Sequence, residues 1–114
     1  LLTGKYGAQR DPKTGGRFDN NKMYQDRYWH EDYFAAVEEL SAIAREASKS
    51  LVELAFQWLL SQLRVDSVIL GASRMEQLEE NLRACEGSRL DTAVLARCDE
   101  VWKRLRGITP KYNR

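Results

Sequence analysis

The chain has 114 residues, enough for one compact domain, and its 43% hydrophobic and 31% charged residues are typical of a globular protein. Its 18 basic and 17 acidic side chains leave a net charge of +1, which gives no support for a nucleic-acid partner or an acidic membrane surface. No apolar run approaches the roughly 20 residues of a membrane span, so we expect no membrane partner.

Residues 7–30 form a polar segment with turn signals such as Asp11-Pro12, so the sequence predicts a long irregular loop. A loop of this length is usually functional or disordered, and its aromatic residues favour an ordered binding loop. Tyr24 and Arg27 have two interpretations. Either the aromatic residues form a small cluster that pins the loop, or they line a pocket in which Arg27 binds a carboxylate.

Two amphipathic helices are predicted next. The first follows His30, the sole histidine, which we expect at the helix entry or on the surface. Its apolar face comprises Tyr33, Val37, Leu40, Ala44 and Ala47, with Phe34 and Ile43 flanking it. The second begins at Ser50, because Ser50 and Glu53 match a capping box, in which each side chain satisfies a free backbone N–H. Its apolar stripe must be buried and comprises Leu51, Leu54, Ala55, Trp58 and Leu59.

The run Ser67–Leu70 is the one convincing strand, because it is short, apolar and β-branched and stops at a glycine. Beyond it, Ser73 and Glu76 repeat the capping-box pattern, so a helix is predicted to begin at Ser73. This helix is predicted to stop at Gly87 and to bury Met75, Leu78 and Leu82.

The start of this helix has a structural and a functional interpretation. Capping boxes are common, and most of them hold no ligand. Alternatively, the free N–H groups and the positive end of the helix dipole hold a phosphate, with Arg74 adding charge. On spacing alone, Glu80 and Asn81 are surface polar residues.

A last helix is predicted from about Thr92 to Arg106 and is ended by Gly107. Its apolar side comprises Val94, Cys98, Val101 and Leu105, with Leu95 and Trp102 beside them. Cys85 and Cys98 fall at apolar helical positions without metal or redox spacing, so we expect reduced core thiols in a cytoplasmic protein. The sequence contains no paired carboxylates, nucleophile motif or zinc pattern, so we predict no catalytic residue and no metal ligand.

One strand cannot form a sheet by itself. A helix–strand–helix order with a single strand fits a slice of an alternating α/β protein better than a complete fold. The chain also begins in mid-motif at Leu1, and we therefore expect it to be the back end of something larger.

Several segments, taken in order and spacing, point to one family. They are Leu1-Leu2-Thr3-Gly4-Lys5-Tyr6, Gly16-Arg17-Phe18, Tyr24 with Arg27-Tyr28-Trp29, Val68-Ile69-Leu70-Gly71-Ala72-Ser73, Glu76-Gln77-Leu78-Glu79-Glu80-Asn81-Leu82, Tyr112 and Arg114. Over essentially its whole length the chain resembles the C-terminal part of an aldo-keto reductase, an NADPH-dependent oxidoreductase. The greatest similarity is to the aflatoxin-aldehyde and succinic-semialdehyde reductase subfamily.

The resemblance implies that residues 1–114 are the C-terminal segment of a (β/α)8 TIM barrel, mostly α-helical when taken alone with one clear strand. Residues 7–30 would be a long cofactor and substrate loop, residues 31–106 the helices and the last barrel strand, and residues 107–114 the C-terminal tail.

The same resemblance implies a role for individual residues. Those that would contact NADPH are Leu2, Thr3, Gly4 and Lys5 along the pyrophosphate, Arg17 folding over the cofactor, Ser73, Arg74 and Gln77 at the 2′-phosphate, and Glu80 and Asn81 beside the adenine. Those that would contact a small aldehyde substrate with an acidic group are Tyr24, Arg27 and Arg114.

Two departures bear on the chemistry. Many aldo-keto reductases have Lys directly after the last strand and Arg in the following helix, where this chain has Gly71 and Gln77. The family's catalytic Asp, Tyr, Lys and His come from earlier barrel strands. The Tyr is the general acid that protonates the carbonyl oxygen, so we expect the isolated chain to be inactive.

The whole aldo-keto reductase would reduce aldehydes by hydride transfer from NADPH. The alternative is a non-catalytic helical module, derived from such a reductase, that serves binding or interaction. In either case we expect a homo-oligomer or another association through the exposed barrel face, which includes Trp58, Leu59, Val68 and Leu70.

Overall fold

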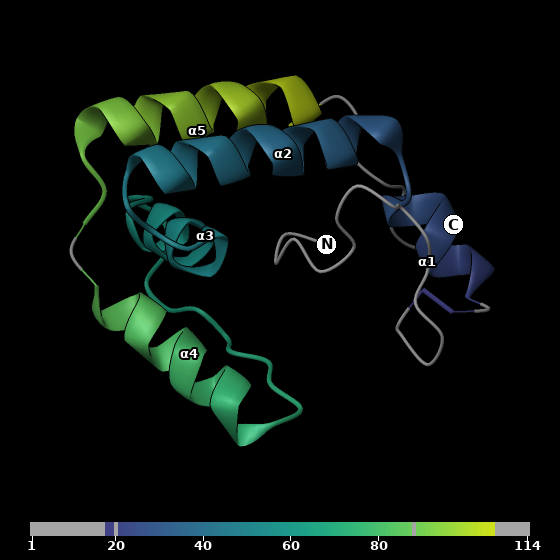
Figure 1. Cartoon of the computed structure of the whole chain (residues 1–114), viewed down its shortest axis with the longest axis horizontal. Coiled ribbons are helices and arrows are strands. Elements are labelled where there is room, and N and C mark those ends of the chain that lie inside the picture. The colour runs from purple at the N-terminus through teal and green to yellow at the C-terminus, as the bar shows by residue number, and fades with distance from the viewer. Residues whose placement is uncertain (1–17, 20, 88, 107–114) are drawn as a thin grey trace.

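A computed structural model describes residues 18–19, 21–87 and 89–106 of the chain. These residues form five helices, which are α1 (Lys22–Tyr28), α2 (Glu31–Glu46), α3 (Leu51–Leu60), α4 (Met75–Glu86) and α5 (Thr92–Leu105). Figure 1 shows α2 and α5 side by side, α3 beneath them, α4 beyond α3, and α1 at the N-terminal end of α2. The prediction that helices dominate the segment after residue 30 is confirmed.

The core lies where α2, α3 and α5 meet. Ile43 of α2, Leu54 of α3 and Val101 of α5 each expose 1% of their surface, and Cys98 is buried beside them. Burial, followed by the nearby charge of Asp99, raises the pKa of the Cys98 thiol, so this side chain packs as a neutral group. The expected reduced thiols are present, because Cys98 and the half-buried Cys85 are both free.

Helices α2 and α5 run antiparallel, as their colours in Figure 1 show, and two ion pairs join them. Arg97 pairs with Glu46, and Arg104 pairs with Glu39 two turns away on each helix. The hydrogen bond from Arg97 lowers the pKa of Glu46. All four side chains are largely exposed, so the pairs add little stability and the buried apolar residues hold the two helices together.

The capping box at the start of α3 is confirmed. The Ser50 hydroxyl accepts a hydrogen bond from the Glu53 backbone N–H at 3.1 Å, and the Glu53 carboxylate accepts one from the Ser50 backbone N–H at 2.6 Å. These bonds satisfy donors that the helix leaves free. The backbone N–H of Ser50, and then its side chain, lower the pKa of Glu53.

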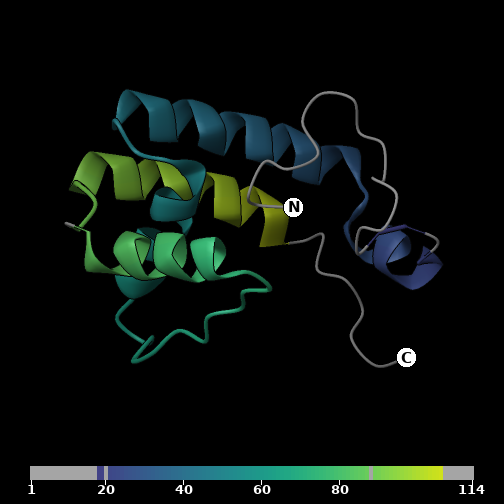
Figure 2. The same cartoon turned by 60° about the horizontal axis from the view of Figure 1, so that its bottom comes forward.

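The predicted strand Ser67–Leu70 is wrong for the described residues, which contain no strand. A strand requires a neighbour for its ladder of hydrogen bonds. No backbone–backbone hydrogen bond joins these four residues to another part of the described chain, and Ile69 exposes 98% of its surface. The segment is therefore irregular between α3 and α4, as Figure 2 shows below the helices.

The boundaries of the predicted loop also need correction. Residues 22–28 of the predicted loop 7–30 form α1, whose first turn is capped by Asn21, because the Asn21 side chain accepts a hydrogen bond from the Tyr24 backbone N–H at 3.2 Å. His30 is the exposed residue that precedes α2, as expected. Predictions for residues 1–17 and 107–114, including the stop at Gly107, fall outside the described residues.

Helical periodicity located the helices better than their buried faces. In α2 the buried residues are Phe34, Ala36, Ile43 and Ala44. Ala44 belongs to the predicted face and Phe34 and Ile43 to its predicted flanks, so the buried face is centred beside the predicted one. In α4 the predicted burial of Met75 and Leu82 is wrong, because they expose 65% and 46% of their surface. The buried residue of α4 is Ala84, which lies against α3. The predicted α5 face is correct at Cys98 and Val101.

The two serines that match the capping-box pattern provide a matched test. Ser50→Ala should lower the free energy of unfolding by about 1 kcal/mol, within the usual range of 0.5–2, because it removes a cap. Ser73→Ala should have a much smaller effect, since the Ser73 hydroxyl caps no helix. Urea unfolding followed by circular dichroism measures both values, and equal losses would contradict the assignment.

The lowered pKa of Glu53 makes the stability of α3 dependent on pH. A folded pKa below the ordinary value of 4.5 gives stability that is present above pH 4.5 and is lost as the pH falls through the folded pKa. The advantage of the wild type over Glu53→Gln in unfolding free energy should therefore shrink with acidification. Urea titrations from pH 7 down to about pH 3 measure this difference. A difference that stays constant with pH would show that the Glu53 charge is not involved.

Candidate functional site

The segment that precedes α4 lies along the first turns of that helix. The Gln77 side-chain oxygen accepts hydrogen bonds from the Ser73 backbone N–H at 3.1 Å and from the Ser73 hydroxyl at 3.0 Å. The Asn81 side-chain nitrogen donates to the Gly71 carbonyl at 3.3 Å. Residues four apart share a helix face, so Gln77 and Asn81 together hold residues 71–73 against α4.

The N-terminus of α4 differs from the prediction. The residue that precedes the helix is Arg74 rather than Ser73, and no side chain caps the first turn. The predicted capping box of Ser73 and Glu76 is therefore wrong. Gln77 accepts from the Ser73 backbone N–H, the donor that Glu76 would bind in a capping box, and the Ser73 hydroxyl is also directed to Gln77 rather than to the helix start.

This uncapped N-terminus has the chemistry of an anion site. The first N–H groups of a helix have no carbonyl partner within the helix, and they lie at the positive end of the dipole. No side chain accepts from them in α4, and the exposed Arg74 stands directly before them. Glu80, on the same helix, is also exposed. The arrangement fits a phosphate group better than a metal ion or an apolar ligand.

The second candidate region is the aromatic cluster around α1. Phe18 and Phe34 are buried, and Tyr24, Tyr28 and Trp29 pack against them. The Phe18 and Tyr24 rings meet edge to face with centroids 6.2 Å apart, and those of Trp29 and Phe34 are 5.0 Å apart. The Gln25 side chain also donates to the Phe18 carbonyl at 2.7 Å. The first interpretation of the aromatic residues, a cluster that pins the chain, therefore fits Tyr24.

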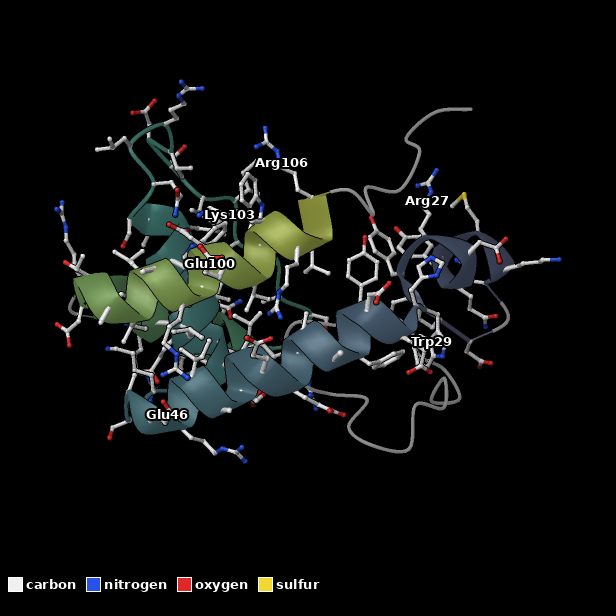
Figure 3. The ribbon with its side chains drawn as sticks, turned by 90° about the horizontal axis from the view of Figure 1, so that it is seen from above. Arg27, Trp29, Glu46, Glu100, Lys103 and Arg106 are labelled. Atoms are coloured by element: carbon white, nitrogen blue, oxygen red, sulfur yellow. The ribbon has the colours of Figure 1, made fainter. Side chains whose placement is uncertain are left out.

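Arg27 lies on the outer side of the same cluster. It is in the last turn of α1, it is half-buried, and Figure 3 shows its side chain directed away from α2. Figure 1 places α1 and α4 in different parts of the described molecule, α1 at the start of α2 and α4 beyond α3. Tyr24 and Arg27 are thus grouped together, as are Ser73, Gln77 and Asn81, but the two groups are separate.

The remaining sequence candidates fall outside the described residues. They are Leu2, Thr3, Gly4, Lys5, Arg17 and Arg114. Over residues 18–19, 21–87 and 89–106, no three His, Cys, Asp or Glu side chains gather in a way that could hold a metal ion. None of the helices α1 to α5 is long and apolar enough to cross a membrane.

Sequence reasoning missed two polar contacts of α3. Gln57 is 97% buried, since it exposes 3% of its surface, and its side-chain nitrogen donates to the Ala84 carbonyl of α4 at 3.3 Å. The next residue, Trp58, donates from its indole N–H to the Asp99 carboxylate of α5 at 2.8 Å. A glutamine among the apolar residues of the second half of this helix, next to Trp58, is the signal that could have pointed to the first contact.

Helical segments with an uncapped, arginine-flanked helix start are compatible with a nucleotide-dependent enzyme. Comparison with known proteins defines the class. The model of the Aldo/keto reductase family matches residues 1–103. The chain therefore belongs to the aldo/keto reductase family.

Individual relatives include aldehyde reductases. The chain is similar to the human aldo-keto reductase family 7 member A3, with 38% identity over 130 residues that cover all of this chain and 39% of the relative. Aflatoxin B1 aldehyde reductase member 2 of Rattus norvegicus is 37% identical, over all of this chain and 35% of its own length. The L-glyceraldehyde 3-phosphate reductase of Escherichia coli K12 is 34% identical over 88% of this chain and 30% of the relative. The chain thus spans about a third of the length of these relatives.

Proposed function

We propose that the chain is the C-terminal part of an aldo-keto reductase barrel that reduces small aldehydes with NADPH. The observation that carries the proposal is the family match over residues 1–103, together with identities of 37–38% to relatives that include an aflatoxin B1 aldehyde reductase. In this proposal residues 1–114 supply part of the cofactor and substrate pockets of a (β/α)8 barrel. The same proposal takes the protein to be cytoplasmic.

The start of α4 would bind the adenosine 2′-phosphate. The uncapped N–H groups of the first turn would donate to the phosphate oxygens, and Arg74 would add a charge-assisted hydrogen bond. Bound NADPH would supply the hydride that reduces the aldehyde carbon. This part of the chain would bind and orient the cofactor. Holding two reactants in a fixed relative geometry lowers the activation free energy of the reaction.

The contacts around α4 refine the roles of its polar residues. Gln77, whose side chain already holds Ser73, would act by fixing the loop through which Ser73 approaches the phosphate. Asn81, bonded to the Gly71 carbonyl, and the exposed Glu80 would face the adenine. Leu2, Thr3, Gly4 and Lys5 along the pyrophosphate and Arg17 over the cofactor complete the proposed cofactor site.

The substrate in this proposal is an aldehyde with an acidic group. Arg27 would bind the carboxylate, because a guanidinium matches that group with two parallel hydrogen bonds. Tyr24 would form the adjoining wall, since it packs in the aromatic cluster that holds α1. Arg114 would close on the same carboxylate from the C-terminal tail.

A non-catalytic binding module remains the second candidate function. The observation that favours it is the set of exposed large apolar side chains, such as Leu63, Ile69 and Met75, which can support association with another protein surface. In the enzyme these residues would contact the rest of the barrel or a second copy.

The role of Arg74 can be tested by cofactor binding to the full-length reductase. Arg74→Ala should weaken NADPH binding by about 1–3 kcal/mol and leave NADH binding almost unchanged, since only NADPH carries the 2′-phosphate. Arg83→Ala is the matched control, because Arg83 lies in the last turn of the same helix and pairs with Glu79. Calorimetric titration measures all four combinations. Equal losses of binding free energy for NADPH and NADH would show that Arg74 does not bind the 2′-phosphate.

The isolated 114-residue chain should show no aldehyde reductase activity. In this proposal the catalytic acid comes from an earlier barrel strand outside the chain, and general acid–base catalysis contributes about 10² to 10⁴ in rate. The assay follows the loss of NADPH absorbance with succinic semialdehyde as substrate. Turnover above the protein-free control that survives further purification would mean that the catalytic residues lie within this chain.

A further inference from the structure

Helix α4 packs against the rest of the described molecule at its C-terminal end. Its buried residue, Ala84, lies in the last turn against α3, whereas Met75 in the first turn exposes 65% of its surface. Figure 1 shows the same arrangement, with the end of α4 beside α3 and its start directed away. A helix of this length is about 18 Å long, so a rotation of about 10° at the packed end moves the other end by about 3 Å.

Gln57 of α3 makes two contacts with the C-terminal end of α4. Its side-chain nitrogen donates to the Ala84 carbonyl at 3.3 Å, which is one of the carbonyls that a helix end leaves without an internal partner. A Cβ atom placed on Gly87, the residue after α4, would lie 2.2 Å from that same nitrogen. The absence of a side chain at Gly87 therefore allows the amide to reach the helix end, and the Gly87 φ of −63° requires no glycine for backbone reasons.

The side chain of Gln57 is poorly suited to stabilise the fold by burial alone. Its oxygen is buried without a hydrogen-bond partner among the described residues, and such a group costs free energy. An apolar residue of similar shape would avoid that cost. What the amide provides instead is a directional contact that relates the end of α4 to α3.

From this contact we propose that Gln57 is a positioning residue, which sets the orientation of α4 on α3 and thereby the place of Gly71–Arg74 at the other end of the helix. The effect on binding rests on the proposed function, in which the start of α4 binds the 2′-phosphate. Gln57 touches neither cofactor nor substrate in this account and acts only through α4.

The test combines orientation, binding and stability for the 114-residue chain. Residual dipolar couplings of backbone amides give the angle between α3 and α4, and 2′-AMP and adenosine serve as probes for the helix start. The variants are Gly87→Ala, which drives a methyl group into the Gln57 amide, Gln57→Leu, which removes the bond without a clash, and the pair Gln57→Ala with Gly87→Ala. Gln62→Ala is the matched control, because the Gln62 amide bonds only to the Trp58 carbonyl within its own part of the chain.

Gly87→Ala and Gln57→Leu should rotate α4 and reduce the preference for 2′-AMP over adenosine by about fivefold, since a charge-assisted hydrogen bond depends on geometry. The double variant relieves the clash at Gly87 but also lacks the Gln57 amide, so it should resemble Gln57→Leu in both values. Gln62→Ala should change neither. An unchanged angle in the two single variants, or a changed angle with an unchanged preference, would overturn the positioning role even if stability falls. If the wild-type chain shows no preference for 2′-AMP over adenosine, the proposed cofactor site is wrong, and so is an effect of Gln57 on cofactor binding. In that case the residual dipolar couplings still show whether Gln57 orients α4.

Discussion

The described structure depends on one helix that is packed on two sides. Leu54 of α3 is buried with Ile43 of α2 and Val101 of α5, and the same helix carries α4 on another face. Successive residues of a helix point about 100° apart, so the neighbours Gln57 and Trp58 reach different partners. Trp58 bonds to Asp99 of α5, and Gln57 bonds to Ala84 of α4. The placement of the three helices α2, α4 and α5 therefore follows from the position of α3.

The sequence predicted local features well where a short motif decides them. The capping box of Ser50 and Glu53 formed because both partners lie within one turn and nothing else competes for them. The same pattern at Ser73 failed, because Gln77 binds the Ser73 backbone N–H in place of Glu76 and the Ser73 hydroxyl points to Gln77 as well. A capping motif therefore predicts a helix start only when no other side chain can reach the capping residue.

Predictions that depend on distant partners were less successful. The apolar run Ser67–Leu70 has the composition of a strand, but a strand is defined by a neighbour, and none lies within the described residues. Periodicity likewise gave the apolar face of α4 without showing that α3 covers only the end near Ala84. The grouping of Ser73, Gln77 and Asn81 was predicted by the family resemblance, whereas the bonds of Gln77 to Ser73 and of Asn81 to Gly71 depend on how the loop folds back on α4.

The attachment of α4 by its last turn also has an evolutionary consequence. Residues between Gly71 and Gln77 make few contacts with the buried core, so substitutions there change its packing little. Most mutations destabilise a protein, and a segment that bears little of the fold's stability can accumulate changes that the core would not tolerate. Substitutions in the first turn of α4 can therefore change ligand preference while the packing of the helices is kept.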